Sequence, residues 1–295
     1  MNRRNLLTSV LTLSSVLMLR PRFASGSETD EFVTRLAALE RRHGGRLGVA
    51  ILDTDSGSRI ARRGDERFLM CSTFKLLAVA TVLAHIDRGA ECLDRRIVFG
   101  KEAVLAWAPV TSHHVGAPGM SIAELCQAAI TVSDNTAANL LLDSLGGPAA
   151  VTQFVRSLGD PVTRLDRIEP ELNVGAPNDV RDTTTPNAML ESMRRVLLGH
   201  ALSDVSRAVL IGWLRACTTG ADKLRAGVPH DWSGGDKTGS GSKGETNDVA
   251  ILWPPQRKPS LVTAYYAGSR ADAAGRSAVL ADVGRIVGAI GKRRI

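Results

Sequence analysis

The sequence predicts an α+β fold in which an antiparallel sheet is flanked by N- and C-terminal helices and a large helical segment is inserted. Three observations predict it. Strand-like apolar stretches lie near both ends of the chain, at 47–61 and 237–266, helical stripes lie outside them, and the part from about 89 to 220 is largely helical in pattern. This order favours a sheet assembled from both ends of the chain. We expect a binding cleft where the sheet meets the helical segment.

The N-terminal elements follow from apolar periodicity. A helix is predicted over 31–42 and is ended by Gly44-Gly45. Next comes a β-hairpin, with strands at 47–52 and 59–61 around a Gly-containing turn. The apolar run that begins at Leu76 then predicts a helix that stops near Gly89.

In the middle of the chain, Ser121 and Glu124 form a capping-box pattern at the start of a helix. Further helices are predicted at 136–145, 148–158, 186–198 and 204–217. Segment 164–182 has little periodicity, and a compact domain rarely keeps so long an irregular loop without a function for it.

Strands return at 237–241, 248–253 and 260–266, and a helix over 271–290 follows them. These elements predict two interlocked domains. We expect a sheet domain formed by 27–70 and 218–295, and an all-helical domain over 71–217 that includes the 164–182 loop.

Residues 1–26 differ from the rest. Arg3-Arg4 is followed by a moderately apolar stretch over 6–19 and then by small residues, which is typical of an export signal. The paired arginines favour the twin-arginine route, with the Sec route as the alternative. The apolar stretch is shorter than the roughly 20 residues that span a bilayer, so we expect no membrane anchor after signal cleavage. We expect a periplasmic protein, with secretion as the alternative.

Charge and composition exclude several partners. The formal net charge of +7 falls to +3 (7 − 4) when the four arginines of the signal are removed, and no basic run with interleaved aromatic residues remains. We therefore expect no nucleic acid partner. No histidine pair or Cys-x-x-Cys has metal-ligand spacing, so we expect no metal and no cofactor. The four cysteines, Cys71, Cys92, Cys126 and Cys217, could pair in three ways or remain buried thiols.

Ser72 and Lys75 are the first candidates for chemistry. Three residues apart at the start of a helix, they lie on one face within about one turn, so a neutral lysine amine could accept the serine's proton. The helix N-terminus favours negative charge there. By itself the pattern more often means a capping serine and a solvated lysine.

Three further groups have ordinary interpretations when taken singly. Ser133-Asp134-Asn135 could be a helix stop and N-cap, Lys237-Thr238-Gly239 an edge lysine before a turn, and Glu169 to Asn173 a solvated acidic loop.

Taken together and in this order, the four motifs resemble the class A serine β-lactamases. Ser-x-x-Lys, Ser-Asp-Asn and Lys-Thr-Gly are shared with the wider penicillin-binding-protein family. The resemblance extends over essentially the whole mature chain, including Trp107 to Thr111 and Thr218 to Gly220. It implies a sheet domain plus an all-helical domain with the active site at their junction. It also implies hydrolysis of the β-lactam ring of penicillins, and so antibiotic resistance, by a protein that we expect to be a monomer.

The resemblance implies a role for each catalytic residue. Ser72 is the nucleophile, and the backbone N–H groups of Ser72 and Ser240 hold the oxyanion. Lys75 and Glu169 are the alternative bases for acylation, and Glu169 is the base for deacylation. Ser133 passes a proton to the leaving nitrogen.

The same resemblance implies the substrate-binding residues. Lys237, Thr238 and Ser240, with Gly239 between them, face the substrate carboxylate. Asn135 holds the acylamide side chain and Asn173 the hydrolytic water. Trp107 forms an apolar wall, with an ordinary core or surface tryptophan as the alternative. The Lys237 to Gly241 form also favours cephalosporins as substrates.

The chain departs from the family at several positions. Val79 stands opposite Cys126, where relatives often have a disulfide, and Gly241 stands where some carbapenem-hydrolysing relatives pair a cysteine with that at position 71. The usual arginine for the substrate carboxylate is absent, since Thr246, Lys223 and Ser277 occupy the matching positions, and Lys223 and Arg276 are the alternative cations.

Two other functions remain as alternatives. A D-alanyl-D-alanine peptidase of the penicillin-binding type shares three motifs but lacks the element from Glu169 to Asn173. A non-hydrolytic β-lactam sensor of the same fold would have lost Glu169, which is present here.

Overall fold

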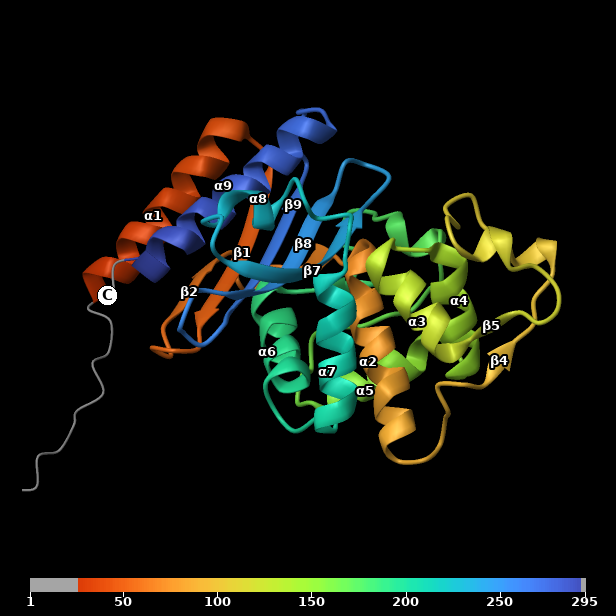
Figure 1. The fold of residues 1–295 in the computed structure, drawn as a ribbon. Coiled ribbons are helices and arrows are strands. Elements are labelled where there is room, and N and C mark those ends of the chain that lie inside the picture. The colour runs from red at the N-terminus through yellow and green to blue at the C-terminus, as the bar shows by residue number, and fades with distance from the viewer. Residues whose placement is uncertain (1–25, 293–295) are drawn as a thin grey trace, which may run out of the picture.

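A five-stranded antiparallel sheet forms the centre of the molecule, with helices on both of its faces (Figure 1). The computed structural model describes residues 26–292. The strand order is β2-β1-β9-β8-β7. The strands are β1 (Arg46–Asp53), β2 (Arg59–Arg62), β7 (Ser233–Ser240), β8 (Thr246–Trp253) and β9 (Ser260–Ala267). Because β1 pairs with β9, both ends of the chain build one sheet, and the predicted fold class is confirmed.

The two faces of the sheet are covered by different helices because strand side chains alternate. On β1, Leu47, Val49 and Ile51 pack into a core with α1 (Gly26–His43) and α9 (Ala273–Lys292), and these two helices lie side by side in Figure 1. Ala50 and Leu52 point the other way, into the larger core around α2 (Phe74–Asp87). Each face therefore has its own apolar core.

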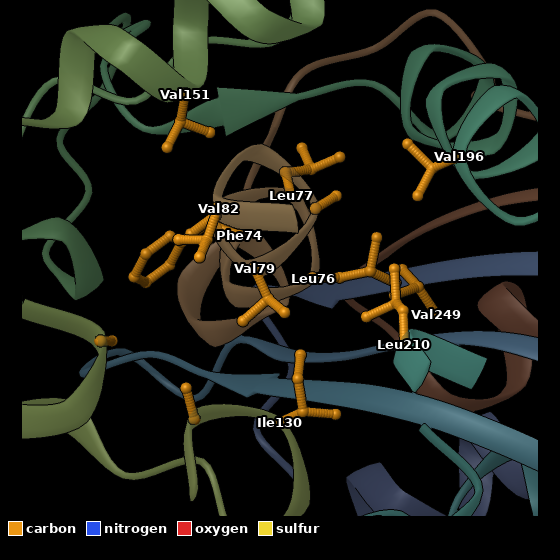
Figure 2. Close-up of a cluster of buried hydrophobic side chains, with 14 of the residues drawn as sticks. Phe74, Leu76, Leu77, Val79, Val82, Ile130, Val151, Val196, Leu210 and Val249 are labelled. Atoms are coloured by element: carbon orange, nitrogen blue, oxygen red, sulfur yellow. The ribbon is translucent and has the colours of Figure 1, made fainter. Parts of the chain in front are cut away.

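Helix α2 is the centre of the larger core. All residues from Phe74 to Leu83 are buried, so this helix is apolar on every side instead of amphipathic. It packs against α3 (Ile122–Thr131), α4 (Asn135–Ser144), α5 (Pro148–Ser157) and α7 (Asp204–Arg215). Figure 2 shows α2 side chains pointing outward on different sides of the helix, among residues from the surrounding helices and Val249 of β8.

The predicted all-helical segment is not purely helical, which corrects the sequence analysis. It contains the strands β4 (Arg96–Ile97), β5 (Met120–Ser121) and β6 (Thr183–Thr184), of which β6 pairs with β3 (Phe68–Leu69), and the 3₁₀ turns η2 (Lys101–Ala103), η3 (Thr111–His113) and η4 (Glu171–Asn173). Strands of two residues are too short to show an alternating pattern. The segment also includes α6 (Pro186–Leu197), which packs on β1 and β9.

Strand β7 starts at Ser233, four residues before the predicted start at Lys237. Gly234 and Gly235 are both extended and pair with β8. A Cβ atom at Gly235 would lie 2.9 Å from the backbone nitrogen of Arg215, at the end of α7. This glycine is therefore explained by a close helix-strand approach and not by a turn. The short helix α8 (Leu224–Gly227) lies just before β7.

The predicted capping box at the start of α3 is confirmed. Ser121 Oγ accepts a hydrogen bond from the Glu124 backbone N–H at 3.2 Å, and Glu124 Oε2 accepts one from the Ser121 N–H at 2.7 Å. The side chain of each residue thus accepts a hydrogen bond from the backbone N–H of the other, and two N–H groups at the helix start that would otherwise lack partners are satisfied. The predicted export signal lies outside the described residues, except for Gly26.

We expect Ser121→Ala to lower the free energy of unfolding by about 1 kcal/mol, because it removes the oxygen that caps α3. Ser121→Thr keeps a hydroxyl at this position and should retain most of the stability. Urea denaturation of the three proteins measures the effect. Equal losses in both variants would show that the cap contributes nothing.

Candidate active site

A cleft of about 350 Å³ opens where the edge strand β7 meets the helical part of the molecule. It is lined by Ser72, Trp107, Ser133, Asn135, Asn173, Thr219, Lys223, Thr238, Gly239 and Ser240. Three other predicted site residues, Lys75, Glu169 and Lys237, are almost completely buried beside this lining. The predicted catalytic and substrate-binding residues therefore gather at one place, although two of them are at positions 72 and 75 and the others lie between 107 and 240.

Ser72 lies in the 3₁₀ turn η1 (Cys71–Thr73), which leads directly into α2. The preceding residue, Cys71, has a φ of 46°, a left-handed conformation that costs on the order of 1–3 kcal/mol in a residue other than glycine. Strand β7 approaches this turn closely. A Cβ atom at Gly239 would lie 2.8 Å from the Met70 carbonyl oxygen and 3.2 Å from the Ser72 nitrogen. The Lys-Thr-Gly motif therefore needs glycine because the strand backbone reaches the backbone of the serine.

Ser72, Lys75 and Glu169 form a connected group. Ser72 Oγ donates a hydrogen bond to Glu169 Oε1 at 3.1 Å, and Lys75 Nζ lies 3.1 Å from the same oxygen. The side chains of Lys75 and Glu169 are both completely buried. A proton on Ser72 therefore faces a carboxylate that is in turn paired with a buried amine.

Besides Glu169, Lys75 has oxygen partners on Ser133 and Asn135. Its ammonium donates to the Ser133 carbonyl oxygen at 2.8 Å, to Ser133 Oγ at 3.3 Å and to Asn135 Oδ1 at 2.6 Å. Burial lowers the pKa of Lys75, and the negative charges of Glu169 and Asp134 oppose this shift without cancelling it. Lys75 consequently releases its proton more readily than an ordinary lysine.

Ser133 lies between the two buried lysines. Its hydroxyl accepts hydrogen bonds from Lys75 and, at 3.0 Å, from Lys237 Nζ. With a φ of 58°, Ser133 is also held in the left-handed region. Burial and the positive charge of Lys75 lower the pKa of Lys237 to about 8. A serine hydroxyl next to two amines with lowered pKa values can pass a proton from one group to another.

Glu169 is held in position by contacts from α4 and from its own loop. Asn139 in α4 makes two hydrogen bonds to the Glu169 backbone, donating to its carbonyl oxygen at 2.8 Å and accepting from its N–H at 2.9 Å. The side-chain amide of Asn173 donates to Glu169 Oε2. An ion pair of 2.6 Å between Arg167 and Asp182 closes the neck of the loop. The irregular segment predicted at 164–182 thus positions a carboxylate.

On the side of β7, Thr238 and Ser240 line the cleft, and Thr238 Oγ1 lies 2.6 Å from Thr219 Oγ1. Of the two alternative cations, Lys223 lines the cleft, and its ammonium contacts the Thr219 carbonyl oxygen at 3.2 Å. The Arg276 guanidinium instead donates to Thr246 Oγ1 at 3.1 Å and to the Ala271 carbonyl oxygen, outside the cleft lining.

Trp107 forms an edge of the cleft. Its indole N–H donates to the Val132 carbonyl oxygen at 3.1 Å, and 56% of the residue is exposed. It is therefore not an ordinary core tryptophan. An exposed indole that is fixed through its N–H offers a flat apolar surface to a ligand.

Some contacts that support the site could not be expected from the sequence motifs. Asp134, between two predicted site residues, is the N-cap of α4 and also accepts hydrogen bonds from Val110, Thr111 and Ala137. Its N-cap pattern was visible in the sequence, but its bonds to the Trp107 to Thr111 loop were not. Asn139 also carries no local signal, because it meets Glu169 only in the folded chain.

All four cysteines lie in the described part of the chain and have free thiols. Cys71 is buried next to the site, and its Sγ would lie 3.0 Å from a Cβ atom at Gly241. Within residues 26–292, no three His, Cys, Asp or Glu side chains are grouped so that they could hold a metal ion.

Two buried carboxyl groups, Asp236 and Asp248, lie on β7 and β8 close to Lys237. Asp236 pairs with Arg225 at 2.5 Å, and Asp248 Oδ2 accepts the Leu224 N–H at 3.1 Å. The Oδ1 atom of each residue is buried without a partner. Burial, followed by the negative charge of Asp236, raises the pKa of Asp248 well above its ordinary range.

Comparisons with known proteins agree on one family. A model of the β-lactamase enzyme family matches residues 31–290. The β-lactamase OXY-1 of Klebsiella oxytoca is 45% identical over 283 residues, which cover 95% of this chain and 96% of the relative. The β-lactamase of Streptomyces albus G is 49% identical over 269 residues, which cover 89% and 85% of the two chains.

Solved structures agree as well. An ancestral class A β-lactamase has a TM-score of 0.85 and 62% identity, covering 87% of this chain and 98% of that one. A putative class A β-lactamase, PenP from Rhodopseudomonas palustris, has a TM-score of 0.87 and 55% identity, covering 88% and 100% of the two chains.

We expect Asp248→Asn to change how stability depends on pH. A carboxyl group whose pKa is higher in the folded state than in the unfolded state stabilises the fold fully only below its unfolded pKa, and this stability is lost as the pH rises toward the folded pKa. The asparagine variant cannot lose a proton here, so its free energy of unfolding should fall less than that of the native protein between pH 4 and pH 8. Urea denaturation across this range measures both proteins, with Asp94→Asn, at an exposed position, as the control. Parallel pH curves for the native protein and Asp248→Asn would contradict the expectation.

Proposed function

This chain belongs to the class A β-lactamase family, and from that membership we propose how the residues of the cleft open and hydrolyse the β-lactam ring. The enzyme is a serine β-lactamase. One observation carries the proposed mechanism: the Glu169 carboxylate contacts both Ser72 Oγ and Lys75 Nζ at 3.1 Å. A second base beside the nucleophile is what hydrolysis of an acyl-enzyme requires.

In the acylation step, Ser72 Oγ attacks the lactam carbonyl carbon and loses its proton. Glu169 Oε1 accepts the Ser72 hydrogen bond and can take the proton. Where Lys75 has first lost its own proton, which its lowered pKa favours, the proton passes onward from Glu169 to the neutral Lys75 amine, which shares the same oxygen. The carbon–nitrogen bond of the lactam then breaks. Ser133, which accepts hydrogen bonds from both buried lysines, gives a proton to the departing nitrogen and recovers one from them.

The negative charge on the carbonyl oxygen is held by the backbone N–H groups of Ser72 and Ser240. The close approach of β7 to the Ser72 turn at Gly239 supports this assignment, because it brings the two backbone segments together. Removing one such donor typically costs on the order of 10²–10³ in rate.

In the deacylation step, Glu169 takes a proton from a water molecule, which attacks the ester carbon and releases Ser72. Asn173 supports this role because its amide holds Glu169 Oε2 and its side chain lines the cleft. The product retains the opened ring as an amine and a new carboxylate, and the proton taken from water returns to Ser72.

The cations beside β7 bind the carboxylate that β-lactam antibiotics carry. Lys237, which is buried beside the cleft, supplies positive charge, and Thr238 and Ser240 supply hydroxyl groups. Lys223 lines the cleft and replaces the arginine that relatives use for the substrate carboxylate. Asn135 holds the acylamide side chain, and Trp107 provides the apolar wall for it. Cephalosporins as well as penicillins are the proposed substrates.

The peptidase and sensor alternatives have no comparable support. Neither alternative explains why a buried glutamate, Glu169, is held beside the nucleophile by Asn139 and Asn173.

We further propose that residues 1–26 direct export to the periplasm by the twin-arginine route. Between residues 26 and 292, no helix has the length and apolar character needed to cross a membrane. Residues 27–70 with 218–295, and residues 71–217, are the proposed domains on the two sides of the cleft.

We expect Glu169→Ala to acylate with a penicillin but to hydrolyse the adduct at least about 10³ times more slowly. Without the negative charge of Glu169, the buried Lys75 loses its proton more readily and can serve as the acylation base, whereas the hydrolytic water has lost its base. Mass spectrometry should show a stable adduct with the mass of the intact antibiotic. Glu171→Ala removes an exposed carboxylate from the same loop and should turn over normally. Rapid return of Glu169→Ala to free enzyme would reject the assigned role.

We expect the KM for a penicillin to rise about tenfold as the pH increases from 7 to 10. The Lys237 pKa is about 8, so its ammonium is charged below this pH and neutral above it, and the attraction for the substrate carboxylate is lost. Steady-state kinetics at a series of pH values measures the change. A KM that stays constant to pH 10 would remove Lys237 from carboxylate binding.

A further inference from the structure

A second cavity, of about 610 Å³, lies behind the 164–182 loop and shares no lining residue with the active-site cleft. One wall is the loop segment from Gly175 to Val180. The other walls include Arg46, the first residue of β1, Arg67, just before β3, and Lys243 in the turn between β7 and β8. This volume is in the range of cavities that hold small organic ligands.

The cavity wall contains an arginine without an acidic partner. Half-buried Arg67 donates hydrogen bonds to the Val162 carbonyl oxygen at 3.1 Å and to Thr183 Oγ1 at 2.9 Å, both of which are uncharged. No ion pair joins it to another residue in the described range. Lys243 likewise donates to a neutral acceptor, the Gly175 carbonyl oxygen, at 2.8 Å.

The other charges around the cavity are largely neutralised. Asp179 pairs with Arg181 at 2.8 Å, and Arg46 pairs with Glu66 at 3.2 Å. Glu245 is the remaining acid, and it accepts the Lys243 backbone N–H at 2.9 Å. Arg67 and Lys243 thus exceed Glu245 by one positive charge (2 − 1), so the cavity favours an anion.

We propose that this cavity is a second ligand site, which binds a small organic carboxylate with an apolar body. The carboxylate is held by the Arg67 guanidinium and the Lys243 ammonium, which can both make charge-assisted hydrogen bonds. The apolar body packs against Leu69, Pro177 and Val180.

A ligand in the cavity affects the position of the 164–182 loop through Lys243. The Lys243 ammonium holds the Gly175 carbonyl oxygen, and the adjacent Ser242 holds the Asn173 carbonyl oxygen through its N–H and its hydroxyl, both at 3.2 Å. A carboxylate that draws Lys243 away from Gly175 loosens the segment whose Asn173 orients Glu169. This consequence, unlike binding itself, rests on the proposed role of Glu169.

Binding is tested with 2-naphthoate and its uncharged analogue 2-naphthamide, by calorimetry on the mature protein. We expect 2-naphthoate to bind with a dissociation constant on the order of 1 mM or below, and 2-naphthamide at least about tenfold more weakly. Lys243→Met should weaken 2-naphthoate binding about tenfold, whereas Lys258→Met, at an exposed lysine in the turn between β8 and β9, should leave it unchanged.

The same titration separates the two cavities. If Lys223→Met abolishes 2-naphthoate binding and Lys243→Met does not, the ligand occupies the active-site cleft and the proposal is wrong. Equal binding of the naphthamide would also overturn it. In backbone NMR spectra, 2-naphthoate should shift the amide signals of Gly175 and Ala176, and the absence of these shifts would count against the site.

The coupling is tested by kinetics with a chromogenic cephalosporin. Saturating 2-naphthoate should lower kcat several-fold, and Lys243→Met should abolish this effect. Purely competitive inhibition would reject the coupling. A native protein that showed no turnover without 2-naphthoate would instead reject the proposed function, so the two failures are distinguishable.

Discussion

The structure of the site depends on one buried ion pair, between Lys75 on α2 and Glu169 on the 164–182 loop. An isolated charge in this environment would be strongly unfavourable, and each of these two groups is tolerated because the other neutralises it. Asn173, Ser133 and Asn135 satisfy hydrogen bonds that the pair leaves open, and Asn139 holds the Glu169 backbone. The ion pair therefore fixes the 164–182 loop to the first turn of α2, next to the nucleophile Ser72.

This constraint explains features that are far from the pair. Helix α2 buries Lys75 completely and is enclosed by other elements from Phe74 to Leu83, so its apolar residues extend around all sides. The edge strand must then come close enough to form the other side of the cleft. Gly239 permits that approach, and two residues of the site, Cys71 and Ser133, are held in the left-handed region. The cost of these strained conformations is met by packing and hydrogen bonds around the site.

Much of the fold could be predicted from the sequence because its signals are local. Apolar stripes located the long helices, and the pattern at Ser121 and Glu124 located the start of α3. The early start of β7 could not be predicted, since Gly235 serves a contact with α7 that only the folded chain contains. The same holds within the site. Motifs brought Ser72, Ser133 and Glu169 together through family resemblance, whereas Asn139 has no motif, and the choice of Lys223 over Arg276 needed their positions relative to the cleft.

The pairing of β1 with β9 also has a consequence for biosynthesis. Ala50 and Thr263, which face each other across these strands, are 213 residues apart in the chain. At roughly 5–20 residues per second, a ribosome needs on the order of 10–40 s to synthesise the partner strand after β1 has appeared. During that interval β1 has only β2 to pair with, because β7, β8 and β9 all follow residue 232. The nascent chain must therefore stay soluble without its central sheet, and catalytic competence arises only when translation is nearly complete.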